Sequence, residues 1–209
     1  MSDLKEMKII ILGSSKVGKT SVLKRYFKNE FDESFLSTIG IEFTTQYFKF
    51  DDEKVRVDYI DTAGQETFRA ISANYIKKAD GVILIFDITE RSSFDLINMW
   101  IDEINKNNNI NNIGKILLGN KIDLEDQREV EIDEGENLAS SIKCKYLEVS
   151  AKTGENVINA MEEIAKDSYK YYKTCRRDST SFSLESSVKK VYFKKQKKKR
   201  HLVNCCQDI

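Results

Sequence analysis

The hydrophobic pattern of the chain alternates between short apolar runs and longer stretches with a helical period. Short runs rich in isoleucine, leucine and valine are typical of strands that are buried on both faces of a sheet. Strands separated by helices need crossover connections, so the pattern predicts an α/β fold whose mostly parallel sheet carries helices on both faces. We expect strands at 7–13, 82–86, 115–118 and 145–149, and helices at 19–28, near 67–79, and at 91–106, 133–142 and 155–173.

A second pattern covers the segment between the first helix and the third strand. Residues 41–50 and 54–60 each alternate apolar and polar side chains, and only a short turn at Asp51 and Asp52 separates them. Two such runs across a short turn predict a β-hairpin, so the second and third strands should be antiparallel.

Composition divides the chain into two parts. The 209 residues are 40% hydrophobic, which is enough for one domain with a full core and a short appendage. No apolar segment is long enough to span a membrane and the N-terminus lacks a signal-peptide pattern, so we expect the protein to be made and kept in the cytosol. From Cys175 onward ten lysines and arginines face only three acids. We therefore predict a domain over 1–174 and a disordered basic tail over 175–209.

A glycine-rich stretch interrupts the pattern where the first strand meets the first helix. It reads Gly13-Ser14-Ser15-Lys16-Val17-Gly18-Lys19-Thr20, and a strand, a tight loop and a helix are the context that a phosphate-binding loop requires. Its glycines let backbone N–H groups approach phosphate oxygens at a helix N-terminus, where the helix dipole favours anions. Lys19 should reach the β- and γ-phosphates, and the Thr20 hydroxyl should ligate Mg²⁺. The stretch predicts binding of a nucleoside polyphosphate.

Two further segments could contact the third phosphate of such a nucleotide. Asp61 ends the third strand and is placed to hold a water on the metal, while Gly64 offers a backbone N–H to the γ-phosphate. Gln65 has both a donor and an acceptor with which to orient an attacking water. Thr38, in the loop before the hairpin, offers a second hydroxyl to the metal. Two loops that each touch the third phosphate form a bistable element.

The identity of the base is predicted by two motifs that follow later strands. Asn120-Lys121-Ile122-Asp123 lies at the carboxyl end of the sheet, where open α/β folds bind ligands. The Asp123 carboxylate can accept from guanine N1–H and from the exocyclic amine, and adenine lacks this pair of donors. Ser150-Ala151-Lys152 offers a backbone N–H to the guanine carbonyl oxygen. Guanine is therefore the expected base.

Taken together, these motifs resemble those of the Ras superfamily of small GTPases over roughly residues 7–173. Within it, 39–43, 67–72, 84–89 and the two cysteines near the C-terminus are similar to the Rab branch. The resemblance implies a six-stranded sheet with one antiparallel strand and five helices, a switch I around Thr38 and a switch II over 61–75. It also implies that Phe31 packs edge-on against the guanine and that Lys121 and Lys152 lay their aliphatic stems along the base.

The resemblance further implies an enzyme that hydrolyses GTP to GDP with Mg²⁺ and acts as a molecular switch in vesicular trafficking. Lys19 and Gln65 are the expected catalytic residues, and because no arginine lies near the site in the sequence, we expect hydrolysis to be slow until a GTPase-activating protein supplies one. The other implied partners are an exchange factor, effectors that bind switch I and switch II, and prenyl escort and GDI-type chaperones. The resemblance implies no nucleic-acid partner, and the protein should be a monomer. The expected metal ligands are Thr20, Thr38 and Asp61, and the expected nucleotide contacts are Gly13, Ser14, Ser15, Lys16, Val17, Gly18, Lys19, Thr20, Ser21, Phe31, Thr38, Asp61, Gly64, Asn120, Lys121, Asp123, Ser150, Ala151 and Lys152.

Two positions depart from the family pattern. Ile60 stands where Rab proteins commonly carry tryptophan, in an expected exposed apolar group with Phe43 and Tyr75 that partners read. Lys16 stands where a glycine or another small residue is usual. Its side chain either reaches into solvent or alters nucleotide affinity and exchange.

The tail carries a candidate membrane anchor. Cys206 is fourth from the end, as in a prenylation motif, and Cys205 offers a second acceptor behind a run of lysines. Gln207 and Asp208 are polar where the simple motif prefers aliphatic residues, which favours two geranylgeranyl groups over one farnesyl group. Lipid and basic residues together would hold the protein at the cytoplasmic face of an intracellular membrane, in exchange with the cytosol.

Two alternative functions remain open on the sequence. A guanine-nucleotide-dependent binding scaffold with little hydrolysis is possible if Lys16 upsets the phosphate site. A nucleoside kinase is disfavoured because no arginine-rich lid for an acceptor is visible.

Overall fold

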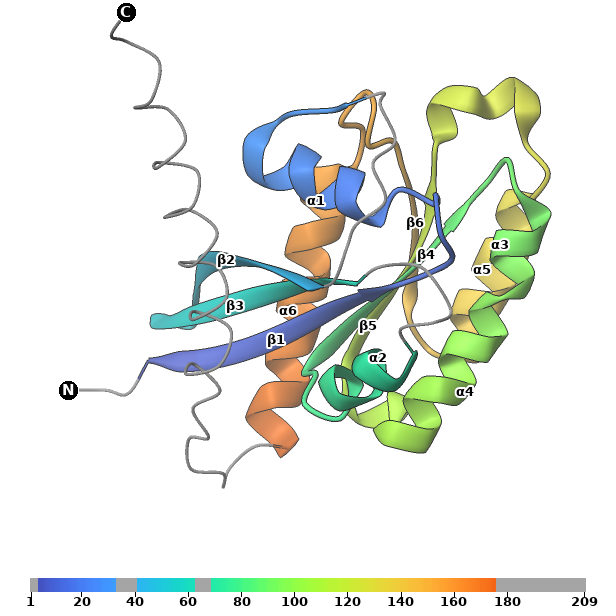
Figure 1. Ribbon diagram of the computed structural model, residues 1–209. Coiled ribbons are helices and arrows are strands. Elements are labelled where there is room, and N and C mark those ends of the chain that lie inside the picture. The colour runs from blue at the N-terminus through green and yellow to red at the C-terminus, as the bar shows by residue number, and fades with distance from the viewer. Residues whose placement is uncertain (1–3, 33–40, 63–68, 176–209) are drawn as a thin grey trace, which may run out of the picture. The chain divides into compact units, whose positions relative to one another are not determined.

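A computed structural model describes residues 4–32, 41–62 and 69–175 of the chain (Figure 1). Six strands form one sheet in the order β2-β3-β1-β4-β5-β6. Every neighbouring pair is parallel except β2 and β3, which are antiparallel, as the hairpin pattern predicted. The strands are β1 (Lys5–Leu12), β2 (Ile41–Phe50), β3 (Glu53–Thr62), β4 (Gly81–Asp87), β5 (Gly114–Asn120) and β6 (Lys145–Val149).

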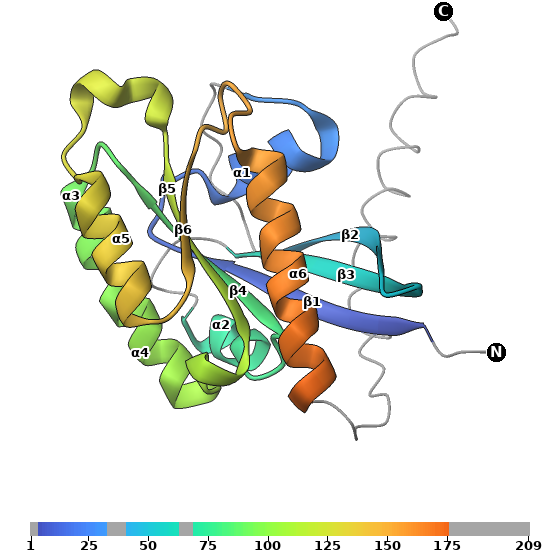
Figure 2. The ribbon, with the colours of Figure 1, turned by 180° about the vertical axis from the view of Figure 1, so that it is seen from behind.

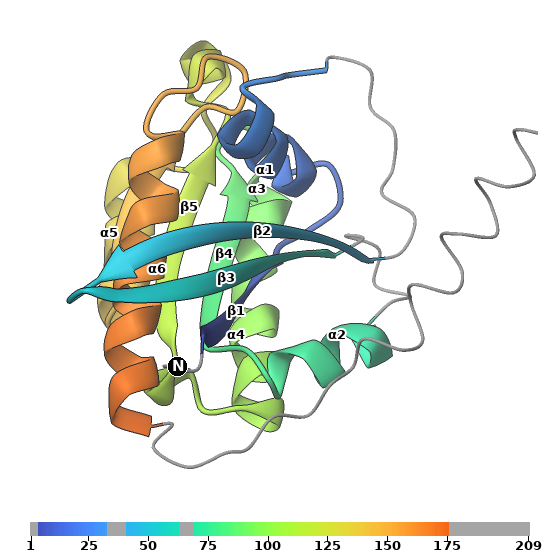
Figure 3. The same ribbon diagram turned by 90° about the vertical axis from the view of Figure 1, so that its left-hand side faces the viewer.

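The position of each strand in the sheet follows from its sequence. All seven residues of β4 and of β5 are buried, because these central strands are covered on both faces. β2 forms one edge and has many exposed residues, which is the arrangement that its alternating pattern favours. In Figure 3, β2 and β3 face the viewer as the curved edge of the sheet.

Helices cover both faces of the sheet, as predicted (Figure 2). Helices α1 and α6 pack on one face, against a core that includes Ile9, Ile11 and Ile85. The other helices pack on the opposite face, against a core that includes Ile10 and Leu12. Successive side chains of β1 therefore point to opposite faces of the sheet and contact different helices. The helices are α1 (Lys19–Lys28), α2 (Arg69–Ile76), α3 (Arg91–Asp95), α4 (Ile97–Asn107), α5 (Ile132–Ser141) and α6 (Val157–Cys175), with 3-10 helices at Ile110–Asn112 and Ile122–Gln127.

The helix expected at 91–106 is divided at Leu96 into α3 and α4. The backbone of Leu96 has φ −74° and ψ −9°, and its N–H points to the carbonyls of both Ser92 and Phe94. Ser92 and Phe94 are the fourth and the second residues before Leu96, so one N–H is shared between an α-helical bond and a much tighter one. The ψ of −9° lies well away from the α-helical value of about −42°, and this change redirects the chain. The five expected helices are otherwise present, with α2 shorter than expected and α6 extending to Cys175.

Several predictions concern residues outside the described ranges. Cys175, the first residue of the expected tail, ends α6, and 176–209 are outside the described part of the chain. Across the described residues, no helix combines the length and the apolar character needed to cross a membrane.

Candidate functional site

The glycine-rich stretch joins the end of β1 to the start of α1, which is the context the motif requires. Gly18 caps α1 with φ 96°, and a Cβ at this position would lie 2.3 Å from Nδ2 of Asn120. A Cβ on Gly13 would lie 2.2 Å from the Ile85 carbonyl oxygen on β4. Both positions therefore need glycine, since a side chain would separate the loop from the sheet or from Asn120.

Lys16 also has a left-handed backbone, with φ 65°, and its side chain is exposed. Residues with a Cβ adopt this conformation at a cost of about 1–2 kcal/mol, so the loop holds Lys16 in a conformation that glycine would adopt more easily. The exposed side chain agrees with the first of the two alternatives, that it reaches into solvent.

Lys19 is the buried cation of the loop, with 5% of its surface exposed. Its ammonium group donates to the carbonyl oxygens of Gly13 at 2.9 Å and of Ser14 at 2.6 Å. Burial lowers the pKa of Lys19 to about 8, and the charge of Asp61 partly opposes this effect. An anion at the loop would favour the charged form of Lys19, because it would replace lost solvation.

Thr20 and Asp61 bring two different segments together beside this lysine. The Thr20 hydroxyl donates to Oδ2 of Asp61 at 2.6 Å, and Asp61 is buried near the end of β3. In the same loop, the Ser14 hydroxyl is shielded from solvent and has no hydrogen-bond partner among the described residues. Buried hydroxyl groups are costly to leave unpaired, so the loop is suited to a polar ligand.

Asn120 connects the glycine-rich loop to the last strand. It is 1% exposed; its Nδ2 donates to the Val17 carbonyl at 2.8 Å, and its Oδ1 accepts from the Ala151 N–H at 3.2 Å. The residues at 17, 120 and 151 come from three loops at the carboxyl ends of β1, β5 and β6. The sequence predicted that these loops meet at one edge, and the structure brings them together.

The side chains around Asn120 are held by further polar contacts. Lys121, whose backbone is left-handed with φ 73°, forms an ion pair with Asp87 at the end of β4. Oδ1 of Asp123 accepts from the Ser150 hydroxyl at 2.6 Å, and the same hydroxyl accepts from the Thr153 N–H at 3.0 Å. Each of these side chains thus has a fixed direction before any ligand is considered.

Arg25 and Asp87 belong to this site but were missed by the sequence analysis. Arg25, on α1, donates to the carbonyls of Ala151 and Lys152, more than a hundred residues away along the chain. Asp87 ends a strand of apolar residues and holds Lys121. No motif marks either residue, although a carboxylate that follows an apolar strand at the carboxyl edge is a signal that could have identified Asp87.

The remaining predicted residues have different outcomes. Phe31 is partly buried and packs against the core beside α1 and α6. Thr38, Gly64 and Gln65 lie outside the described ranges, as do Cys205 and Cys206. The structure describes the other expected contacts, Ser15, Ser21 and Lys152 included, around the same carboxyl edge of the sheet.

The prediction that Ile60 belongs to an exposed group is wrong. Ile60 is fully buried, because its pairing with Ile10 places it on the sheet face that α2 to α5 cover. Phe43 is 44% exposed, and its ring lies 5.7 Å from that of Tyr75. The apolar surface here therefore consists of the exposed Phe43 with the partly buried Tyr75 beside it, and Ile60 is not part of it.

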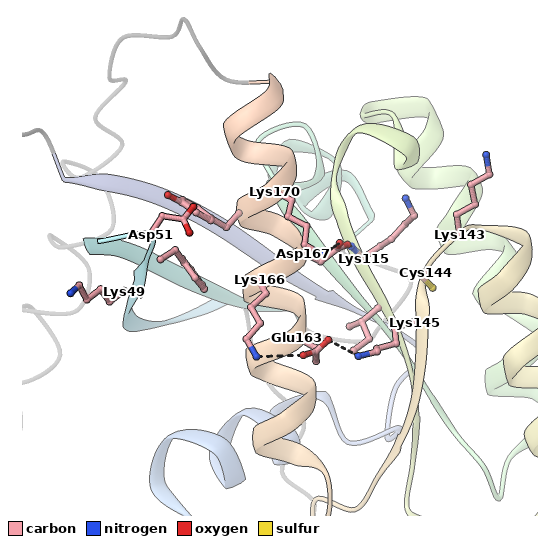
Figure 4. Close-up of a pocket in the computed structure, with 13 residues that line it drawn as sticks. Lys49, Asp51, Lys115, Lys143, Cys144, Lys145, Glu163, Lys166, Asp167 and Lys170 are labelled. Carbon is pink, nitrogen blue, oxygen red and sulfur yellow. Dashed lines mark hydrogen bonds and ion pairs between the residues drawn. The ribbon is translucent and has the colours of Figure 1, made fainter. Parts of the chain in front are cut away.

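A hollow with a volume of about 740 Å³ lies at the opposite edge, where β5 and β6 begin (Figure 4). Six lysines and three acids line it, and some of them pair: Glu163 lies 2.6 Å from Lys145 and 3.4 Å from Lys166. Burial raises the pKa of the Cys144 thiol there to about 12, which makes it a poor nucleophile. This hollow therefore shows no chemistry comparable to that of the carboxyl edge.

Comparison with known proteins gives a consistent result. The model of the Ras family matches residues 8–170. Among curated proteins, "Ras-related protein RABA5c" of Arabidopsis thaliana is 38% identical over 200 residues, which cover 95% of this chain and 93% of that protein. "GTP-binding protein ypt2" of Schizosaccharomyces pombe is 39% identical over 161 residues, covering 77% and 80% of the two chains. "Ras-related protein Rab-8A" of Bos taurus is 41% identical over 160 residues, covering 77% of each.

Proposed function

The chain belongs to the Ras family, within the Rab branch of small GTPases, and from this premise we propose that its carboxyl edge binds GTP and hydrolyses it to GDP. Rab-like GTPases act as switches in vesicular trafficking, and this is the function we assign. The observation that supports the site most directly is the pair of hydrogen bonds by which Asn120 joins Val17 to Ala151. The bond to Val17 holds the phosphate loop against Asn120, and the bond to Ala151 places the base-binding loop beside it.

The phosphate half of the site consists of residues 13–20. Lys19, which now donates to two carbonyls of its own loop, exchanges one or both for oxygens of the β- and γ-phosphates. Backbone N–H groups at the start of α1 provide the remaining donors, with the Ser14 hydroxyl beside them.

The oxygen atoms beside the phosphate loop fit a magnesium ion. Thr20 and Asp61 present a hydroxyl and a carboxylate within 2.6 Å of each other, and hard oxygen donors are the ligands that Mg²⁺ prefers. No group of three acids, histidines or cysteines among the described residues could hold a metal, but Mg²⁺ usually takes one or two carboxylates together with substrate phosphates. We assign Thr20 and Asp61 as ligands, with Thr38 as a third. When bound, the ion offsets negative charge on the phosphates.

The base half consists of residues 120–123 and 150–154. Ser150 holds one oxygen of Asp123, which directs the carboxylate toward the guanine N1–H and exocyclic amine. The Ala151 N–H makes only a 3.2 Å bond to Asn120, so the guanine carbonyl oxygen can compete for it. Lys121 and Lys152 flank the base, and Phe31 packs against its edge.

Hydrolysis needs an aligned water and stabilisation of charge on the transferred phosphoryl group. Gln65 orients the water, whose oxygen bonds to the γ-phosphorus as the bond from that phosphorus to the bridging oxygen of GDP breaks. A proton of the water passes to the phosphate that is released, and Lys19 stabilises the charge that develops on the bridging oxygen. For this superfamily, a GTPase-activating partner that supplies an arginine raises slow intrinsic turnover roughly 10⁵-fold. We therefore propose that this protein hydrolyses GTP slowly on its own.

Single-turnover GTP hydrolysis by wild type and Gln65→Leu tests this function. Wild type should convert bound GTP slowly and the variant more slowly still, since the water is no longer oriented. If wild type binds GTP but hydrolyses it no faster than Gln65→Leu does, the protein is a nucleotide-dependent scaffold. Phosphoryl transfer to a nucleoside monophosphate would instead identify a kinase.

The tail and the partners complete the proposal. We assign prenyl groups to Cys205 and Cys206, which together with the basic tail anchor the protein to the cytoplasmic face of an intracellular membrane. The regulators are then an exchange factor, a GTPase-activating protein, and escort and GDI-type chaperones, while effectors bind switch I and switch II. Unmodified thiols in mass spectra of protein from its native cells would refute the anchor. Localisation of tagged wild type beside Gln65→Leu and Thr20→Asn tests its dependence on nucleotide.

A further inference from the structure

Helix α1 carries an arginine that reaches the base-binding loop from outside. Nε of Arg25 donates to the Ala151 carbonyl at 2.8 Å, and Nη2 donates to the Lys152 carbonyl at 2.6 Å. Two successive carbonyl groups thus accept from one planar guanidinium. This fork cannot be reproduced by a lysine, whose ammonium is a single point of charge.

The direction of the Arg25 side chain is itself fixed. Its Nη1 donates to both the backbone carbonyl and the Oδ1 of Asn29, each at 2.9 Å, and Asn29 caps the end of α1 with φ 54°. Near Gly154, where φ is 88°, a Cβ would come within 3.4 Å of Cδ of Arg25, so the aliphatic stem passes close to the loop. Arg25 therefore lies between the end of its own helix and the loop.

The inner side of the same loop is held by Ser150. Its hydroxyl accepts from the Thr153 N–H and donates to Asp123, while its carbonyl accepts from the Gly154 N–H at 2.8 Å. The peptide group that links Lys152 to Thr153 is thus bound on both sides, by Arg25 through its carbonyl and by Ser150 through its N–H. Contacts from Arg25 to Asp123 form one continuous chain.

We propose that Arg25 is a positioning residue for guanine recognition, which fixes the loop that directs Asp123 and so slows the release of guanine nucleotides. This inference rests on the function proposed above. Because α1 also begins with Lys19 and Thr20, the same helix holds the phosphate loop at one end and the base-binding loop at the other. Arg25 thereby makes the affinity for the guanine base depend on the position of α1.

The test compares release of two nucleotides from wild type and Arg25→Lys. Inosine diphosphate lacks the exocyclic amine, so it makes one hydrogen bond fewer to Asp123 than GDP does. Loss of the fork should accelerate GDP release about tenfold and inosine diphosphate release only about threefold, because less of its binding depends on Asp123. Asn29→Gly, which keeps the left-handed cap but removes one acceptor from Arg25, should accelerate GDP release by a smaller factor.

The matched control is Lys28→Ala, which removes an exposed cation from the same helix. It should leave release of both nucleotides and the Tm unchanged. Equal acceleration of both nucleotides in Arg25→Lys, or no acceleration, would overturn the positioning role even if the Tm falls. A wild-type protein that retains neither nucleotide would instead refute the proposed function.

Discussion

The buried lysine of the phosphate loop (13–20) and the polar side chains of the base-binding segments (120–123 and 150–154) differ in where they find partners. Lys19 donates to carbonyls of its own loop, whereas Asn120 joins residues more than a hundred positions before it to residues about thirty after it. Asp123 and Lys121 likewise bind side chains from other segments. The base-binding segments hold one another in place, while the phosphate loop must exchange internal bonds for a ligand. On the proposed function, we therefore expect recognition of the base to be more nearly preorganised than recognition of the phosphates.

The largest expected effect is on the phosphate side. Lys19→Met removes the only described cation in the loop that is buried, and it should weaken GDP binding about a thousandfold, since two charge-assisted bonds are lost. Equilibrium titration with GDP measures this. Lys24→Met serves as a control because Lys24 pairs only with Asp32 on the surface, at 3.1 Å, in the contacts described. A loss below tenfold would show that backbone groups alone hold the phosphates.

A smaller effect is expected when one support of the base half is removed. Asp87→Asn abolishes the ion pair with Lys121 but keeps an oxygen for the Thr89 N–H, which now bonds at 3.0 Å. GDP release should accelerate about tenfold, because Lys121 is no longer directed along the base. Asp95→Asn, which loses a surface pair with Arg91, is the control. Unchanged release would mean that the base half does not depend on this support.

The pH dependence of binding separates the two halves. Burial holds the pKa of Lys19 near 8 in the free protein, so its proton is lost above that pH, while phosphate binds the charged form. Affinity should therefore fall as pH rises, with the Kd for GDP about fourfold higher at pH 8.5 than at pH 7. Calorimetry in two buffers should detect proton uptake at pH 8.5. Asp87→Asn should show the same ratio between the Kd values at the two pH values. A Kd for GDP that does not change with pH in wild type would contradict the explanation from the buried Lys19.

The smallest effect concerns backbone strain in the phosphate loop. Lys16→Gly should raise the free energy of unfolding by about 1 kcal/mol or less, because glycine adopts the left-handed conformation without a Cβ clash. Lys143, with φ 57°, is far from the site, so Lys143→Gly should give a similar gain and no change in GDP release. We expect Lys16→Gly to change release by no more than about twofold. A larger change in the rate of GDP release in Lys16→Gly, without such a change in Lys143→Gly, would show that Lys16 has a role in nucleotide exchange.

The sequence was most informative where a motif follows a strand directly. Strands end at Leu12, Asn120 and Val149, and parallel strands bring the residues at and after these ends to one edge of the sheet. The antiparallel hairpin was equally readable, because two alternating runs and a two-residue turn leave few other pairings. These features depend on local pattern and on general rules of sheet topology.

Other features depend on contacts that the pattern does not contain. Arg25 occupies an ordinary position on a helix, and its role arises from a loop that is distant in sequence. Ile60 is buried because its place in the sheet, opposite Ile10, puts it on the face that α2 to α5 cover. The break at Leu96 depends on one residue's dihedral angles, which helical periodicity does not report. Tertiary packing decides each of these outcomes.

The bond between Asn120 and Val17 has a consequence for biosynthesis. The glycine-rich loop leaves the ribosome early, but the amide that holds it is 103 residues later, and the Ala151 N–H follows only after a further 31. A growing chain can thus form the first strand and helix long before it can retain a nucleotide. On the proposed function, loading with guanine nucleotide must wait until residue 151 has been translated, so we expect ligand capture to be a late event in synthesis of the domain.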